Sequence, residues 1–150
     1  MSAVIDSHHD DHHHGPAKGF SRWLYTTNHK DIGSMYLWFS LVMLFIGGAM
    51  AMVIRAELFE PGSQIVSPEF YNQMVTNHGL IMVFGVIMPA FVGFANWMIP
   101  MQIGAPDMAL PRLNNLSFWI LPVAFGILLS TFFMEGGAPN FGWTFYAPLS

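Results

Sequence analysis

A single histidine stands at the head of the apolar stretch VTNHGLIMVFGVIMP, residues 75–89. His78 is the only ionisable side chain between residues 74 and 101. Because burying such a group in hydrocarbon is costly, its presence there predicts a function. A neutral imidazole is a strong axial ligand for haem iron, and a histidine can also carry a proton; Gly79 leaves space beside it for the edge of a flat cofactor. The alternative is a histidine that hydrogen-bonds to a neighbouring helix.

Other polar residues fall near the two ends of the apolar runs. Arg55 ends the first run on the same side as His78, so a cation and an imidazole can reach one site. Asn96 follows His78 by 18 residues, which is about 27 Å along a helix that rises about 1.5 Å per residue. Asn96 therefore gathers with Asp107 and Asn114 on the opposite side. For Arg55 the alternative is a snorkelling side chain that marks a helix end.

Asp107 lies in the short connection QIGAPDMALPR, where we expect it to be the one acid among basic neighbours. The functional interpretation is an acid that collects protons at the mouth of a polar path, in which Asn96 and Asn114 hold ordered water. The alternatives are an Asp107 that caps the loop or pairs with Arg112, an N-cap role for Asn114 or Asn115, and a helix-joining role for Asn96.

The composition is that of a membrane protein, with 53% hydrophobic and 9% charged residues against roughly 25% charged in soluble domains. The absence of cysteine excludes disulfides, thiolate catalysis and thiolate-bound metal. Five Lys and Arg against nine Asp and Glu, without a basic patch among aromatic residues, give no support for nucleic-acid binding.

Three apolar runs are each long enough to cross a hydrocarbon core of about 30 Å, which takes about 20 helical residues. They cover residues 32–54, 74–101 and 113–134 and predict an all-α membrane protein. The second helix is expected to begin near Ser67 as its N-cap, followed by Pro68. Pro89 and Pro122 fall within runs, where they should kink the helices.

The first 19 residues, MSAVIDSHHDDHHHGPAKG, form a polar tail that we expect to be disordered, with residues 20–150 as the folded part. Its histidines could bind a transition metal, but adventitious binding by a solvated tail is favoured. Basic residues gather on one side of the membrane, which predicts a cytoplasmic N-terminus. They are Lys18, Arg22, Lys30 and Arg112, against Arg55 on the other side.

Four stretches occur in an order and spacing known from one protein family. They are WLYTTNHKDIGSMY, RAELFEPG, TNHGLIMVF and GFANWMIPMQIGAPDMALPRLNNLSFWILP. From residue 23 to the C-terminus the chain resembles the start of subunit I of the haem-copper terminal oxidases, and most of all the aa3-type cytochrome c oxidases. The resemblance implies three transmembrane helices that form the first part of a twelve-helix subunit.

The resemblance implies a haem site on the outer side of the membrane. His78 matches an axial ligand of the low-spin haem, haem a. Arg55 matches an arginine that hydrogen-bonds the formyl group of this haem. Trp143, in FGWTFYAP, matches a tryptophan near the haem propionates.

On the inner side, the resemblance implies a proton path. Asp107 matches the aspartate at the entrance of the D proton pathway, and Asn96 and Asn114 match asparagines that line its narrow part. Tyr36 on the first helix is expected to line the path as well.

A cation site is also implied near the outer surface. Glu57, with backbone oxygens near Glu60 and Gly62, matches a calcium or sodium site of the family. Three donors fall short of the six to eight that calcium usually takes, so other groups or water must complete the set.

The implied activity is that of a terminal respiratory oxidase in the inner membrane of a bacterium or an equivalent respiratory membrane, in contact with membrane lipid. Electrons from cytochrome c pass through a copper centre on another subunit to the low-spin haem. They continue to a pair of high-spin haem and copper, where oxygen becomes water with proton uptake and pumping. The ligands of this pair and the second low-spin ligand are absent here. We therefore expect a fragment, or a chain that assembles with others, and not a complete catalyst.

Three alternatives stay open. A quinol oxidase of the same superfamily would take its electrons from quinol. A non-redox proton carrier built around His78 would contain no haem. A membrane scaffold would use His78 only for packing.

Overall fold

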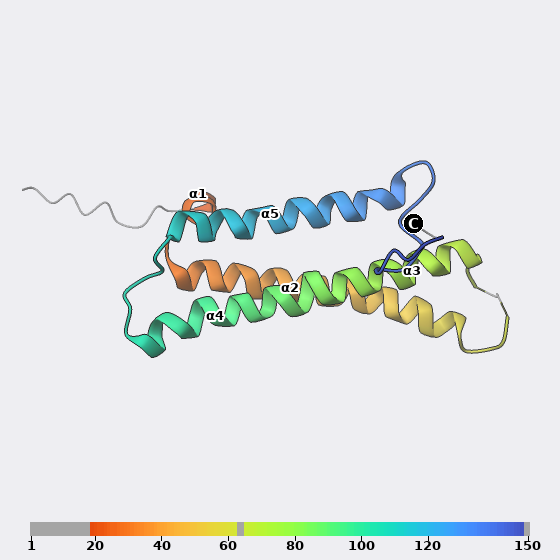
Figure 1. Cartoon of the computed structure of the whole chain (residues 1–150), viewed down its shortest axis with the longest axis horizontal. Helices are drawn as coiled ribbons and strands as arrows, with labels where there is room; N and C mark the ends of the chain where they lie inside the picture. Colours follow the sequence, from red (N-terminus) through yellow and green to blue (C-terminus); the bar gives the residue numbers. More distant parts are fainter. Residues whose placement is uncertain (1–18, 63–64, 149–150) are drawn as a thin grey trace, which may run out of the picture.

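The computed structural model describes residues 19–62 and 65–148, and within these ranges every regular element is helical (Figure 1). The predicted tail and its histidines fall on residues 1–18, outside the described part, so this prediction stays untested. The elements in chain order are α1 (Phe20–Tyr25), α2 (His29–Glu57), α3 (Pro68–Leu80), the π-helix η1 (Ile81–Ile87), α4 (Met88–Ile103), α5 (Pro111–Ser130) and the 3₁₀ turn η2 (Thr131–Phe133).

Three of the helical stretches are long and apolar enough to cross a membrane, which confirms the predicted all-α membrane architecture. They comprise 29 residues in His29–Glu57, 36 in Pro68–Ile103 and 23 in Pro111–Phe133. Each begins before its apolar run because polar residues fill the first turns. The first one also continues past Arg55 to Glu57.

The helix starts follow from local capping. The side chain of Ser67 accepts the backbone N–H of Phe70 at 3.3 Å, and Pro68 begins α3, as predicted. Asn28 caps α2 in the same way, since its side chain accepts the N–H of Lys30 at 2.9 Å. These caps satisfy amide groups that no helical carbonyl can reach.

A π-helical stretch, Ile81–Ile87, ends two residues before Pro89 within the second span. Proline lacks an N–H and its ring crowds the carbonyl four residues earlier, which here is Gly85. A wider turn accommodates this loss without breaking the helix. The second predicted proline, Pro122, lies inside α5.

Helices α2 and α4 approach each other at two glycines. A Cβ added at Gly33 would lie 2.9 Å from the carbonyl oxygen of Gly93 and 2.8 Å from Cδ1 of Trp97. A Cβ at Gly93 would lie 3.0 Å from the carbonyl oxygen of Gly33. The two backbones are therefore in mutual contact, as small residues permit between membrane helices.

We expect Gly33→Ala to destabilise the assembled protein by roughly 1–3 kcal/mol, because a methyl group there must displace backbone. The measurement is the melting temperature of the purified assembly in detergent. Gly126→Ala is the control, since nothing within 4 Å of that position meets an added Cβ. Equal melting temperatures for Gly33→Ala and the wild type would contradict the backbone contact.

Helix α5 packs on α2 and η1 through aromatic side chains. The ring of Phe118 lies edge-on to Tyr36 with centroids 5.2 Å apart, and Phe125 meets Phe39 at 5.6 Å. Even so, only 11% of the most apolar 18-residue window of this span is buried within the chain. The remaining apolar surface requires lipid or further helices around it.

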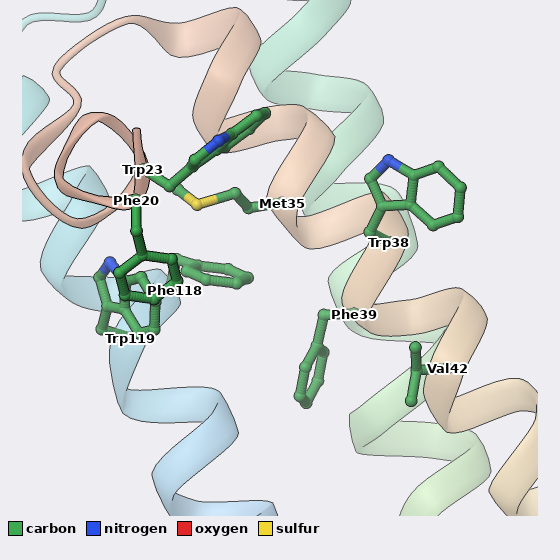
Figure 2. A pocket seen from close by; sticks show the side chains of 8 residues that line it. All are labelled: Phe20, Trp23, Met35, Trp38, Phe39, Val42, Phe118 and Trp119. Carbon is green, nitrogen blue, oxygen red and sulfur yellow. The ribbon is translucent and has the colours of Figure 1, made fainter. Parts of the chain in front are cut away.

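An apolar groove of about 440 Å³ opens between α1, α2 and α5, near the start of α2 (Figure 2). Its lining contains no ionisable side chain, so it is unsuited to carrying protons. The lining residues are Phe20, Trp23, Met35, Trp38, Phe39, Val42, Phe118 and Trp119.

Candidate functional site

His78 lies in the last turn of α3 and is half-buried against α2. Its Nδ1 is 2.9 Å from the carbonyl oxygen of Gly47. Because a carbonyl oxygen can only accept, Nδ1 must carry the proton. In the neutral ring the lone pair is then on Nε2, which has no hydrogen bond to another described residue. This arrangement holds the ring with a nitrogen ready to bind a metal or take up a proton.

Gly47 permits this bond because its backbone is close to the second span. An added Cβ would lie 2.8 Å from Sδ of Met82 and 3.2 Å from Cγ2 of Ile81. Gly79, beside His78, has more room: its added Cβ would meet only Cδ1 of Trp143, at 3.8 Å. The predicted space beside the histidine is therefore bordered by an aromatic side chain.

Arg55 and Trp143 lie at the same end of the molecule as His78. Arg55 follows Gly47 by 8 residues on α2, which is about 12 Å along the axis, and its side chain is exposed. No salt bridge of Arg55 occurs within residues 19–62 and 65–148. Trp143 lies in the segment after η2 and contacts the ring of Phe84, with centroids 6.4 Å apart. The structure thus places Trp143 beside Gly79, the neighbour of His78. It shows no contact between the described side chains of Arg55 and His78.

A hydrogen-bonded chain of polar groups occupies the opposite end of the bundle. Asn96 is 3% exposed, and its Oδ1 accepts Nδ2 of Asn114 at 2.6 Å. The carbonyl oxygen of Asn96 accepts Nδ1–H of His29 at 2.8 Å. The predicted grouping of Asn96 with Asn114 is thus present, linking α2, α4 and α5.

Tyr36 extends this chain toward the centre of the bundle. Ser117 donates its hydroxyl proton to the carbonyl oxygen of Asn114 at 2.7 Å. Its oxygen is 2.8 Å from Oη of Tyr36, so the tyrosine donates in this second bond. Tyr36 is 3% exposed and therefore contributes a buried hydroxyl to the chain.

Asp107 is not part of this hydrogen-bonded chain of polar groups. It lies in the exposed connection between α4 and α5. One of its carboxylate oxygens accepts the N–H of Met108 at 2.7 Å. This bond agrees with the alternative in which Asp107 caps the loop. The predicted ion pair is wrong, because within the described part Asp107 forms no salt bridge with Arg112. Leu110, and neither Asn114 nor Asn115, is the N-cap of α5. Asp107 is thus free of a cationic partner there.

Asp107 is also not the one acid at this end, contrary to the prediction. Asp31 lies in the first turn of α2, where its Oδ1 is 3.0 Å from an amino group of Arg22. The guanidinium also donates to Oδ2 at 3.1 and 3.3 Å. The Asp31 carboxylate is thus paired with the Arg22 guanidinium, whereas the Asp107 carboxylate has no cationic partner among the described residues.

Glu57 is buried at 6% exposure at the end of α2. Its Oε2 accepts the backbone N–H groups of Ile65 and Val66 at 2.9 and 3.0 Å. Glu60 and Gly62 are exposed. Within the described residues, no three His, Cys, Asp or Glu side chains gather to hold a metal ion. In the structure Glu57 therefore fastens the connection between α2 and α3.

Sequence reasoning missed His29 and Ser117. His29, Gly33, Tyr36 and Ser40 recur at spacings of four, three and four residues, and all are buried. This helical spacing marks one face of α2, and it could have identified His29 as part of the polar chain. Ser117 follows Asn114 by three residues on α5, one helical turn away.

A model of the family described as "Cytochrome C and Quinol oxidase polypeptide I" matches residues 31–150. The chain belongs to this family. It therefore shares the family's multi-helix membrane architecture, and the three spans described above are its counterpart. The polypeptide I family comprises haem-copper proteins, so haem and copper are expected in the full protein.

Similar members of the polypeptide I family carry oxidase names. The chain is 49% identical to cytochrome c oxidase subunit 1 of Corynebacterium diphtheriae, over 91% of this chain and 24% of that protein. It is 49% identical to the probable cytochrome c oxidase subunit 1-alpha of Streptomyces coelicolor, over 90% and 23%. It is 48% identical to the heme-copper oxidase subunit I+III of Aeropyrum pernix, over 86% and 16%. The chain thus spans about a quarter or less of the length of these relatives.

Proposed function

We propose that this chain is part of a terminal respiratory oxidase that passes electrons from cytochrome c through haem to oxygen, forming water. The observation that carries the proposal is the bond from Nδ1 of His78 to the carbonyl of Gly47, which leaves Nε2 for iron. The family membership and the names of the relatives support the same function. The full assembly, with the copper and high-spin haem ligands that this chain lacks, performs the reaction.

The residues around His78 fit a low-spin haem a. A bound haem would supply reversible one-electron chemistry. His78 would hold the haem iron through Nε2, and the Gly47 carbonyl would keep its ring from rotating and raise its basicity. Arg55 would donate a hydrogen bond to the haem formyl group, and Trp143 would lie near the propionates.

The polar chain at the other end is proposed to carry protons inward from Asp107. Asparagine does not titrate, so Asn96 and Asn114 would order water and would not trap the proton. The second N–H of the Asn114 amide and its Oδ1 remain for water after its bond to Asn96. Tyr36 continues the line of hydroxyl groups. Uptake against the membrane potential stores about 2.3 kcal/mol per charge per 100 mV, which couples it to pumping.

The proposed setting is the inner membrane of a bacterium or an equivalent respiratory membrane. The N-terminus and the Asp107 end face the cytoplasm, since most basic residues lie there. The partners are other oxidase subunits, including one with a copper centre, together with cytochrome c and membrane lipid. A calcium or sodium ion at Glu57, Glu60 and Gly62 remains part of the proposal.

We expect Arg55→Met to shift the absorption band of the low-spin haem and to lower its reduction potential. A fixed positive charge near the haem favours the reduced form, by an amount on the order of 1 kcal/mol. Difference spectra and a redox titration of the purified assembly measure both effects, with Arg55→Lys as the charge-retaining control. If the low-spin haem band and reduction potential stay unchanged in Arg55→Met, the arginine is a snorkelling side chain at a helix end.

The matched family also covers quinol oxidases, which makes quinol the second candidate donor. Turnover of the purified oxidase with reduced cytochrome c, compared with turnover with a quinol, decides between them. A purified assembly that contains no haem would instead favour the non-redox proton carrier.

A further inference from the structure

The segment after η2 folds back beside α3 (Figure 1). Two hydrogen bonds fasten it. The N–H of Gly142 donates to Oγ1 of Thr76 at 3.0 Å. Nδ2 of Asn77 donates to the carbonyl oxygen of Pro139 at 3.4 Å. The two anchors are thus the two residues that precede His78.

Thr76 is well suited to accept this bond. Its side chain is 2% exposed, and its hydroxyl proton is donated to the carbonyl oxygen of Asn72 at 2.8 Å within the helix. The hydroxyl is therefore fixed in direction and presents a lone pair to Gly142. If that lone pair were absent, the amide of Gly142 would lose its partner in a part-buried place, which is unfavourable.

The bond acts on the next residue, Trp143. The indole contacts the Phe84 ring, and its Cδ1 lies 3.8 Å from the position that a Cβ at Gly79, next to His78, would take. Trp143 is nevertheless 52% exposed, so these contacts cover only part of it. Its place beside the histidine depends on the anchored backbone at Gly142.

We infer that Thr76 is a positioning residue that holds Trp143 beside the His78 site. This inference rests on the haem proposed above, because Trp143 is proposed to lie near its propionates. Thr76 itself touches no reacting group. It fixes the loop through Gly142, and the loop places the indole, which tunes the surroundings of the haem.

The test compares Thr76→Val, which keeps the shape and loses the acceptor, with Thr76→Ser, which keeps the hydroxyl, in the full oxidase. We expect Thr76→Val to raise the amide exchange rate of Gly142 about fivefold to tenfold. It should also shift the low-spin haem potential in the direction that Trp143→Phe shifts it, at unchanged haem content. Thr76→Ser should restore wild-type exchange and potential, and Thr76→Val should add nothing to Trp143→Phe.

Two results would overturn the inference. Unchanged exchange at Gly142 in Thr76→Val would show that the bond does not anchor the loop. Faster exchange with an unmoved haem potential would show that the anchor does not position Trp143. Should Thr76→Val fail to assemble, Thr76→Ala removes the same acceptor with a smaller side chain and is judged by the same two readings. Amide exchange at Gly142 does not depend on haem. The haem proposal is tested separately by His78→Ala, so its failure is distinguishable from a failure of the Thr76 anchor.

Discussion

His78→Ala is expected to remove the low-spin haem from the assembled oxidase and to abolish turnover. The alanine offers no nitrogen to the iron, and no other described histidine lies near: His29 is at the opposite end of α2 from the α3 site. The carbonyl of Gly47 would also lose its donor. Haem extracted from the purified assembly, measured against protein, should fall by one haem per complex.

His29→Ala is the matched control for this change. Like His78, His29 donates its Nδ1–H to a carbonyl oxygen, that of Asn96 at 2.8 Å, and it is buried. Its loss disturbs packing to a similar degree but leaves the proposed haem site intact. Equal loss of haem in both variants would mean that His78 acts through folding and not through the iron.

Asp107→Asn is expected to slow turnover by about tenfold or more while both haem spectra stay intact. Positioned acids and bases commonly contribute roughly 10²–10⁴-fold to proton transfer, so a path without its entrance acid should be starved of protons. The exposed Asp107 carboxylate accepts a hydrogen bond from the N–H of Met108, and the side-chain oxygen of asparagine can accept the same bond. The fold should therefore survive. Oxygen consumption and proton uptake in reconstituted vesicles measure the effect.

Asp31→Asn is the control at the same end of the bundle. The Asp31 carboxylate is already paired with Arg22 at 3.0 Å, so it is a poor collector of protons. We expect near-normal turnover in Asp31→Asn. Full turnover and full proton uptake in Asp107→Asn would remove Asp107 from the path, and an equal loss in both variants would point to a general effect of charge.

The features that the sequence predicts well depend on local chemistry. The three apolar runs identify the spans because length and composition alone decide what can cross a bilayer. Ser67 and Pro68 mark the start of α3 because capping involves neighbours in the chain. The helical rise separates His78 from Asn96, and the structure has them at opposite ends.

The features that escaped prediction depend on contacts between distant residues. The partner of His78 is the backbone carbonyl of Gly47, 31 positions away, and a carbonyl leaves no mark in the sequence. The π-helical stretch contains Gly85, whose added Cβ would lie 3.0 Å from the Phe125 ring. Asn114 was open to an N-cap interpretation, since nothing local reveals its bond to Asn96 on another helix.

The most direct test of the proposed haem site is the reduced-minus-oxidised absorption spectrum of the full assembly, recorded for wild type, His78→Ala and His29→Ala at equal protein levels in the membrane. We predict that the low-spin haem band disappears in His78→Ala and persists in His29→Ala. An unchanged band in His78→Ala would contradict axial ligation by this histidine and would favour the proton-carrier or scaffold interpretation.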